Sequence, residues 1–321
     1  MGSVSVTDLA AILGAIVLAG LGGELFFKGV LGTAAALRLP KLLVATGLAA
    51  FATSSPELIV STVAALAGQP EIGLGDALGS NIANIALLFG LALLFGPIRV
   101  ERNEFGRDYS IALAIPILTL WLAREGVISR NEGALLLLLF ALWIGLLIRS
   151  GLAARALVAD TEPVDQECSS QSLSKSLVFS LLGLAALMLA GKLFVNGATG
   201  VASAFGVDNY IIGATVVAFG TSLPELVTVL LARIRGHDDV GIGTLLGSNL
   251  FNGMAIVGVA ASIHQIVVPP MEIAMTVGAC VLALLLLIPN RREVIGRHRG
   301  PILLLVYSVF IAATVFVGRA T

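Results

Sequence analysis

Charged side chains are scarce in this chain of 321 residues. Asp, Glu, Lys and Arg make up 12% of it, whereas hydrophobic residues make up 57%. Soluble domains contain about 25% charged and about 45–50% apolar residues. So few charges do not cover the surface of soluble domains of this length, and the mean hydropathy of +1.00 agrees. The composition therefore excludes a soluble protein and predicts a polytopic membrane protein surrounded by the lipid bilayer.

Cysteine and histidine are also scarce, and the charges nearly balance. The two cysteines, Cys168 and Cys280, form no disulfide framework, and the chain has no cluster of Cys and His that would suit a soft metal. A net charge of −1 gives no reason to expect a nucleic-acid partner. The first residues, MGSVSVTD, lack the basic region of a signal peptide, so we expect no cleaved leader. No protein partner is predicted.

Long apolar runs recur along the whole chain. A helix needs about 20 residues to cross a hydrocarbon core about 30 Å thick. The runs are continuously apolar rather than alternating, which favours helices over barrel strands and predicts an all-α fold. Ten transmembrane helices are expected, at residues 8–27, 40–66, 71–95, 109–123, 132–149, 176–195, 210–233, 240–262, 268–288 and 301–318.

Basic residues lie mostly on one side of these predicted spans. With the N-terminus outside, fifteen of the 19 Lys and Arg residues fall on the cytoplasmic side. Such an excess of basic residues is typical of cytoplasmic loops. We therefore expect both termini to lie outside.

The chain contains an internal repeat with an offset of 168 residues. FATSSPEL at 51–58 returns as FGTSLPEL at 219–226, and GDALGSNIANI at 75–85 returns as GTLLGSNLFNG at 243–253. Over 48 aligned positions the halves share 17 identities, among them Thr, Ser, Pro, Glu, Gly and Asn. Two apolar helices aligned by chance would match Leu, Ala and Val instead, so the sequence predicts two structural repeats. The G-x-x-x-G pairs of both halves are expected to permit close helix packing.

Each half of the chain contains five predicted helices. Because five is odd, the second half enters the membrane from the opposite side, and the halves become inverted repeats. We expect the first repeat at 1–149, a short cytoplasmic linker at 150–175 and the second repeat at 176–321. Secondary transporters have this architecture, and their sites lie near the midplane where the repeats meet.

One glutamate in each half lies inside a predicted span and directly follows a proline. These pairs are Pro56 with Glu57 and Pro224 with Glu225. Proline lacks an amide hydrogen, so helices two and seven are expected to break there, and broken backbone at membrane depth lines a cavity or is buried in protein. No Lys or Arg lies beside either glutamate in its helix. A transported cation would compensate these charges; a protonated structural glutamate and a simple packing kink are the alternatives.

Further oxygen-bearing residues follow the glutamates at helical spacing. Residues three or four positions apart share one face of a helix, and four predicted helices each carry one such stripe. The stripes are Ala50, Thr53, Ser54 and Glu57; Ser80 and Asn84; Ala218, Thr221, Ser222 and Glu225; and Ser248 and Asn252. Two carboxylates with amide and carbonyl oxygens suit Ca²⁺, and Na⁺ uses the same hard ligands. For Ser and Thr alone, hydrogen bonding between helices is the alternative.

At these motifs the chain resembles the calcium/cation antiporter superfamily, and most closely its sodium/calcium exchangers. TSSPEL and TSLPEL, with GSNIAN and GSNLFN, are similar to the two alpha repeats of that family. The resemblance covers both halves. It implies that the protein is an antiporter rather than an enzyme. Such an antiporter exchanges Ca²⁺ for Na⁺ without a cofactor, and helices one and six slide across the other helices to alternate access. The resemblance implies all twelve stripe residues as ion ligands, with Ala50 and Ala218 acting through their carbonyls.

Three features depart from the family pattern. Many microbial members and the potassium-dependent branch have Asp where this chain has Asn252, so the site keeps two carboxylates, which argues against potassium co-transport. Asp76 aligns with Thr244 and shares the stripe of Ser80 and Asn84. It either lines the outer path or is a solvated aspartate at a helix start, which the preference of Asp for helix N-termini favours. The segment 150–175 is too short for the regulatory loop of eukaryotic exchangers, which implies a prokaryotic protein of the plasma membrane.

Three other functions compete with Na⁺/Ca²⁺ exchange. An H⁺/Ca²⁺ antiporter is the nearest, because a glutamate carries a proton as readily as it binds Na⁺. An intramembrane hydrolase would need a base beside a nucleophile, and the histidines (His237, His264 and His298) all lie near predicted helix ends. A passive channel would conduct without a counter-ion, whereas inverted repeats and broken helices favour alternating access.

Overall fold

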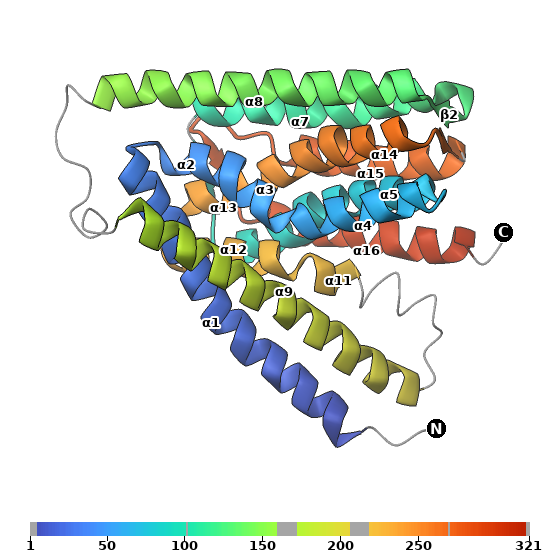
Figure 1. The fold of residues 1–321 in the computed structure, drawn as a ribbon, viewed down its shortest axis with the longest axis horizontal. Coiled ribbons are helices and arrows are strands. Elements are labelled where there is room, and N and C mark those ends of the chain that lie inside the picture. Colours follow the sequence, from blue (N-terminus) through green and yellow to red (C-terminus); the bar gives the residue numbers. More distant parts are fainter. Residues whose placement is uncertain (1–4, 101, 159–171, 206–217, 269, 319–321) are drawn as a thin grey trace.

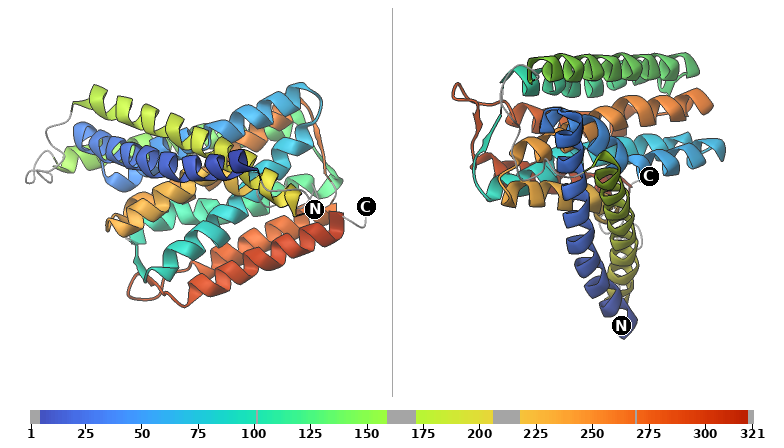
Figure 2. Two further views of the ribbon diagram at one scale, coloured as in Figure 1. Left: turned by 90° about the horizontal axis from the view of Figure 1, so that it is seen from below. Right: turned by 60° about the vertical axis from the view of Figure 1, so that its left-hand side comes forward.

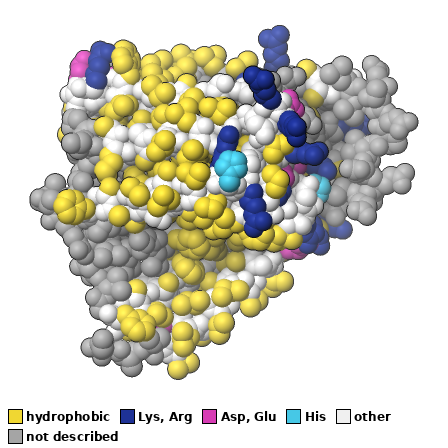
Figure 3. All heavy atoms as spheres, turned by 180° about the vertical axis from the view of Figure 1, so that it is seen from behind, with side chains coloured by type: hydrophobic (Ala, Val, Ile, Leu, Met, Phe, Trp, Pro, Cys, Tyr) yellow, Lys and Arg dark blue, Asp and Glu magenta, His cyan; other side chains and the backbone are white. Residues whose placement is uncertain are grey.

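The computed structural model describes residues 5–100, 102–158, 172–205, 218–268 and 270–318. These residues are almost entirely helical, with two small two-stranded sheets (Figure 1). Many large apolar side chains on the outer helices are exposed, among them Leu13, Leu138 and Leu181. Figure 3 shows hydrophobic side chains over most of one face of the molecule. An apolar surface of this extent requires a cover, which a lipid bilayer provides.

Two long helices, α1 (Val6–Leu37) and α9 (Leu173–Ala204), lie side by side and cross the rest of the molecule obliquely (Figures 1 and 2). Glycines permit this close contact, because a Cβ at Gly29 of α1 would collide with Ser180 of α9. Packing through small residues is the usual way in which apolar helices associate in membranes.

The remaining helices, with four short strands between them, form a bundle in which most helices run along one common direction (Figure 1). In chain order, the elements of the first half are α2 (Lys41–Val44), η1 (Ala45–Ala49), α3 (Ala50–Thr53), α4 (Ser55–Leu66), α5 (Pro70–Ile82), η2 (Ala83–Leu88), α6 (Phe89–Leu94), β1 (Ile98–Arg99), α7 (Arg102–Leu122), η3 (Ala123–Glu125), β2 (Val127–Ile128) and α8 (Arg130–Val158). In the second half they are α11 (Ala218–Thr221), α12 (Leu223–Ile234), α13 (Asp238–Leu250), η5 (Phe251–Ile256), α14 (Val257–Ile263), β3 (Ile266–Val267), α15 (Pro270–Leu286), β4 (Val294–Ile295) and α16 (Arg299–Gly318).

The 168-residue offset of the sequence is also present in these elements. Helices α4 and α12 begin 168 residues apart, as do α5 and α13 and the π-helical segments η2 and η5 that follow them. The short strands pair antiparallel across the halves, β1 with β4 and β2 with β3. Because each sheet takes one strand from each half, the halves interlock instead of folding as separate units.

Both helices predicted to break do so two residues before their proline. Ser54 and Ser222 interrupt the helices with φ near −89° and −85° and ψ near 4° and 10°. In the first half, the segments 41–53 and 55–66 are bent by 45° at this break. Proline then occupies the first turn of the next helix, where its missing amide hydrogen costs no hydrogen bond within that helix.

By length and composition, five described helices are able to cross a membrane, or six if the bent pair counts as one span. They are Val6–Leu37, Pro70–Leu94, Arg130–Ala154, Leu173–Ala202 and Asp238–Ile263, with Lys41–Thr53 plus Ser55–Leu66 as the sixth. The other predicted spans correspond to shorter or less uniformly apolar helices, and part of the predicted seventh span, 210–217, lies outside the described residues. The ten-span arrangement therefore stays a prediction.

Several predicted boundaries differ from the structure. The first span was expected to end at residue 27, but α1 continues to Leu37. The fourth span, expected at 109–123, belongs to α7, which already begins at Arg102 because helix continues through the polar residues before the apolar run. The expected linker at 150–175 is helical at both ends, since α8 continues to Val158 through Leu and Ala residues and α9 begins at Leu173. The remaining linker residues, 159–171, lie outside the described part of the chain.

Candidate cation site

The two glutamates lie near the start of helices that begin at the breaks. Glu57 is in the first turn of α4 and Glu225 in the first turn of α12. The free amide groups and positive dipole end of a helix N-terminus favour a negative charge there. Pro56 and Pro224 also deprive the carbonyls four residues earlier of their helical donors. Each break therefore places a carboxylate beside backbone oxygens.

Most of the twelve predicted ligand residues are buried. Glu57 is 4% exposed and Glu225 2%. The buried polar residues also include Thr53, Ser54, Ser80, Asn84, Ser222, Ser248 and Asn252, while Thr221 is half-buried. Ala50 is buried as well. Ala218 is the first residue of α11, and its side chain lies outside the described part of the structure.

Glu225 brings three of the stripes together. Its Oε1 accepts from Ser54 Oγ of the first half and from Ser248 Oγ of α13, both at 3.5 Å. Thr53 Oγ1 lies 3.5 Å from Ser248 Oγ and donates to Ala50 O over 3.3 Å. All four distances are long for hydrogen bonds between oxygens. The oxygens are gathered without being paired tightly.

Several buried oxygens in this region have no hydrogen-bond partner among the described residues. They are Glu57 Oε2, Glu225 Oε2, Asn84 Oδ1 and Asn252 Oδ1. The charge of Glu225 acts on that of Glu57, so the two carboxylates lie within electrostatic range. The ion pairs of the described residues involve other acids, such as Glu24, Asp108 and Asp238. Unpaired buried oxygens with uncompensated negative charge are costly, and a hard cation removes that cost.

Two asparagines that the sequence analysis did not propose connect the halves. Asn81 Nδ2 donates to Asn249 O over 3.2 Å, and Asn249 Nδ2 donates to Asn81 O over 3.1 Å. Asn84 Nδ2 also donates to Asn249 Oδ1 over 3.1 Å, which leaves Asn84 Oδ1 available to a cation. Both asparagines belong to the repeated G-S-N string, and that repetition was the signal available in the sequence. They were not among the predicted ligands, because they lie one position beyond the serines and therefore on a different face of the helix.

The π-helical segments occur beside these residues. η2 begins at Ala83 and η5 at Phe251, each two residues after the asparagine that ends G-S-N. Asn84 and Asn252 are the second residues of these segments. Single π-helical turns inside helices occur frequently at functional sites.

Close helix packing through G-x-x-x-G is present in the second half. A Cβ at Gly243 would lie 2.8 Å from Leu42 O, and one at Gly247 would collide with the backbone of Thr46. η1 and α13 therefore touch through backbone. For Gly75 and Gly79 no described atom lies within 4 Å of the added Cβ, so the expected packing is not observed in the first half.

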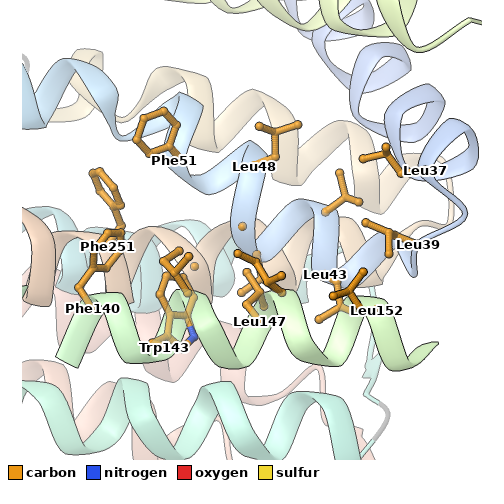
Figure 4. Close-up of a pocket in the computed structure, with 17 residues that line it drawn as sticks. Leu37, Leu39, Leu43, Leu48, Phe51, Phe140, Trp143, Leu147, Leu152 and Phe251 are labelled. Carbon is orange, nitrogen blue, oxygen red and sulfur yellow. The ribbon is translucent and has the colours of Figure 1, made fainter. Parts of the chain in front are cut away.

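An apolar groove lies on the other side of η1. It has a volume of about 430 Å³ and lies between the α2–η1–α3 segment and α8, where Leu147, Trp143 and Phe140 face Phe51 and Phe251 (Figure 4). Leucine and aromatic side chains dominate its lining, so it offers few oxygens to an ion. The cation site and this groove are therefore chemically distinct.

Comparison with known proteins identifies the family. The model of the sodium/calcium exchanger protein family matches residues 7–149 and 175–316. The inner membrane protein YrbG of Escherichia coli (strain K12) is 33% identical over 230 residues, 70% of each chain. The sodium/calcium exchanger MaX1 of Methanosarcina acetivorans is 27% identical over 351 residues, 98% of this chain and 100% of that protein.

A solved structure agrees with these matches. The sodium-calcium exchanger NCX_Mj, in a crystal soaked with zero Na⁺ and Ca²⁺, has a TM-score of 0.81 and 27% identity, and the match covers 96% of this chain and 99% of that chain. The family consists of ion transporters rather than enzymes, with ions as substrates and no cofactor. The chain is therefore a helical, polytopic membrane protein that belongs to the sodium/calcium exchanger family.

Proposed function

We propose that this protein is a secondary antiporter that exchanges Ca²⁺ for Na⁺. The observation that carries the proposal is the pair of buried glutamates, Glu57 and Glu225, on broken helices, each with one carboxylate oxygen unpaired. Among the described residues no Lys or Arg forms an ion pair with either glutamate. The names of MaX1 and NCX_Mj, both sodium/calcium exchangers, support the choice of ions.

The chemistry of exchange follows from shared ligands. Ca²⁺ takes 6–8 oxygens, and two carboxylates with two amide oxygens and nearby hydroxyls and carbonyls make up such a set. Na⁺ ions binding to the same carboxylates displace Ca²⁺, so only one kind of cargo occupies the site at a time. The twelve stripe residues, from Ala50 to Asn84 and from Ala218 to Asn252, are the proposed ligands.

We also propose ten spans arranged as two inverted repeats. The equal offsets of α4 and α12, and of α5 and α13, support a repeated architecture. The long helices α1 and α9 hold equivalent places in the two halves and contact each other outside the main bundle (Figure 2). Sliding of this pair across the bundle would open the site alternately to the two sides of the membrane.

The proposed orientation places both termini outside the cytoplasm, in the plasma membrane of a prokaryotic cell. The start of α1 and the end of α16 lie towards the same side of the molecule (Figure 1). Most Lys and Arg side chains visible on one face gather towards the opposite end (Figure 3). This separation agrees with a basic cytoplasmic face.

Transport by purified protein in proteoliposomes tests the function. Calcium uptake is measured with Na⁺, K⁺ and H⁺ gradients imposed separately. The proposal expects uptake driven by the Na⁺ gradient after the proton gradient has been collapsed. Uptake driven by the proton gradient alone would identify an H⁺/Ca²⁺ antiporter, and uptake without any counter-ion gradient would identify a channel. Glu125→Gln, which changes an exposed acid far along the chain from both motifs, is the control for substitutions of the two site glutamates.

A further inference from the structure

Among the many positions at which the two repeats differ, two extend an oxygen-bearing stripe in the first half: Ser61 stands where the second half has an apolar residue, and Asp76 stands where it has a hydroxyl. Ser61 aligns with Val229, and Asp76 aligns with Thr244. Ser61 lies one turn beyond Glu57 on α4, and Asp76 lies one turn before Ser80 on α5. Both differences therefore extend the stripes of the candidate cation site towards the connection between α4 and α5.

These two additions come from helices in direct contact. α4 and α5 are antiparallel neighbours (Figure 1). A Cβ at Gly73 of α5 would collide with Ser61 Oγ, so the Ser61 hydroxyl lies against α5. Asp76 is three positions after Gly73, on the same side of that helix. Ser61 therefore lies on the face of α4 that packs against α5, and Asp76 lies on the side of α5 that contains Gly73.

Neither oxygen group is neutralised or paired among the described residues. Ser61 is 1% exposed, and its Oγ has no hydrogen-bond partner among the residues that the structure describes, like Glu57 Oε2 one turn away. Asp76 is half-buried, and no described Lys or Arg forms an ion pair with it. Its charge acts on Glu57. A buried hydroxyl without a partner and a carboxylate without a counter-charge are both features of a cation site.

Asp76 is also not the solvated helix-start aspartate that the sequence favoured. α5 begins at Pro70, so Asp76 lies in the second turn, beyond the positions where a side chain caps free amide groups. The acid of the first turn is Glu71, which is exposed. Asp76 therefore lacks the usual reason for an aspartate near a helix start.

The equivalent positions of the second half have no such features. Val229 is buried and apolar, and Thr244 Oγ1 donates to Val240 O in its own helix over 2.9 Å. The extra oxygens therefore occur only on the α4–α5 side among these aligned pairs.

We propose that Ser61 and Asp76 form an accessory Na⁺ site on the path between Glu57 and the α4–α5 connection. One carboxylate and one hydroxyl favour a monovalent cation, because Ca²⁺ requires more oxygens and more negative charge. This inference rests on the proposed function, and in the proposed orientation the accessory site faces outside. Asp76 supplies a third negative charge to this region, whereas the neutral amide of Asn252 supplies none.

Two transport modes separate the accessory site from the main one. Na⁺-driven calcium uptake is measured in proteoliposomes over a range of Na⁺ concentrations, and Ca²⁺/Ca²⁺ exchange is measured without Na⁺. For Asp76→Asn we expect the Na⁺ concentration for half-maximal uptake to rise about tenfold, as loss of one nearby charge predicts. Ca²⁺/Ca²⁺ exchange should change little. Ser61→Val, which copies the second half, should shift the Na⁺ dependence in the same direction, and Asp76→Glu should restore it.

Glu71→Gln is the matched control, because it removes an exposed acid from the first turn of the same helix. The Na⁺ dependence of the melting temperature gives a second readout that requires no transport. If the Na⁺ dependence of uptake and of the melting temperature is the same for Asp76→Asn as for Glu71→Gln, the accessory site is overturned. An equal loss in both transport modes also overturns it, since Asp76 would then serve Ca²⁺ or the structure. Absence of Na⁺-driven uptake in the unmodified protein instead overturns the proposed function itself.

Discussion

Asn81 and Asn249 donate their side-chain amides to each other's backbone carbonyls, at 3.2 and 3.1 Å. They are 168 residues apart, so the same residue of each repeat makes the same bond to its mate. A reciprocal pair of this kind forms where a two-fold relationship brings equivalent helices together. The pair joins α5 to α13 directly beside the proposed ligands Asn84 and Asn252.

The symmetry of this pair ends at its side-chain oxygens, which leads to the first prediction. Asn249 Oδ1 accepts from Asn84, whereas Asn81 Oδ1 has no hydrogen-bond partner in the described part of the chain. Asn249→Ala therefore removes two interactions and leaves Asn84 unoriented, and it should destabilise the protein by about 1–3 kcal/mol. Asn81→Ala should cost less and weaken calcium binding less. Thermal unfolding and calcium titration measure both effects, with the exposed Asn131→Ala as control. Equal effects of the two variants would contradict the inferred role of Asn249.

The second prediction concerns the charge of the glutamates. Glu57→Gln keeps the size of the side chain and removes a buried charge that Glu225 and Asp76 repel. In buffer without Ca²⁺ and Na⁺ we expect it to melt at the same temperature as the unmodified protein or higher. Added Ca²⁺, which at 100 times its Kd would stabilise a binding protein by about 2.7 kcal/mol, should have no effect on the variant. Calcium-dependent stabilisation that persists would show that Glu57 is not a ligand.

The third prediction concerns the helix break. Pro56→Ala restores an amide hydrogen that Ala52 O is able to accept, and so favours a continuous helix through Ser54. Stability should stay the same or rise by about 1 kcal/mol, the net value of one hydrogen bond, while exchange slows because Glu57 and the carbonyls move apart. Pro116→Ala, which changes a proline inside α7, provides the control. Calcium uptake and thermal unfolding are measured together. Undiminished transport in Pro56→Ala would remove the break from the mechanism.

The fourth prediction tests the contact between α1 and α9. A Cβ at Gly183 of α9 would collide with the backbone of Phe26 in α1. Gly183→Ala should therefore force the helices apart and destabilise the protein by about 1–3 kcal/mol. Gly20→Ala, with no described atom within 4 Å of the added Cβ, should be neutral or slightly stabilising. The melting temperatures of the two variants in detergent provide the comparison, and equal values would show that the long helices do not pack as described.

Local properties of the chain were readable without the structure. The missing amide of proline and the spacing of three or four residues act within one or two helical turns. For this reason the breaks at Ser54 and Ser222, and the placement of Glu57 and Glu225 just beyond them, follow from the sequence. The repeat offset is likewise a property of the sequence, and the helices α4, α5, α12 and α13 reproduce it.

Boundaries were less predictable. The apolar run of the fourth predicted span begins well after Arg102, where α7 begins, because a helix extends beyond the apolar segment when its polar end reaches water. Asp76 also shows that a helix boundary is difficult to place from the sequence. Its preference for a helix start was a sound expectation, but Pro70 begins the helix earlier and places Asp76 in the second turn.

The sequence by itself determined the membrane class, the repeat, the two breaks and the types of oxygen that each helix presents. Only the tertiary structure decided which oxygens meet. Ser54 of the first half lies against Glu225 of the second, Asn81 pairs with Asn249, and Ser61 lies against α5 beside Gly73. The physical reason is that helical spacing specifies a face, whereas the partner of that face depends on the packing of helices far apart in the chain.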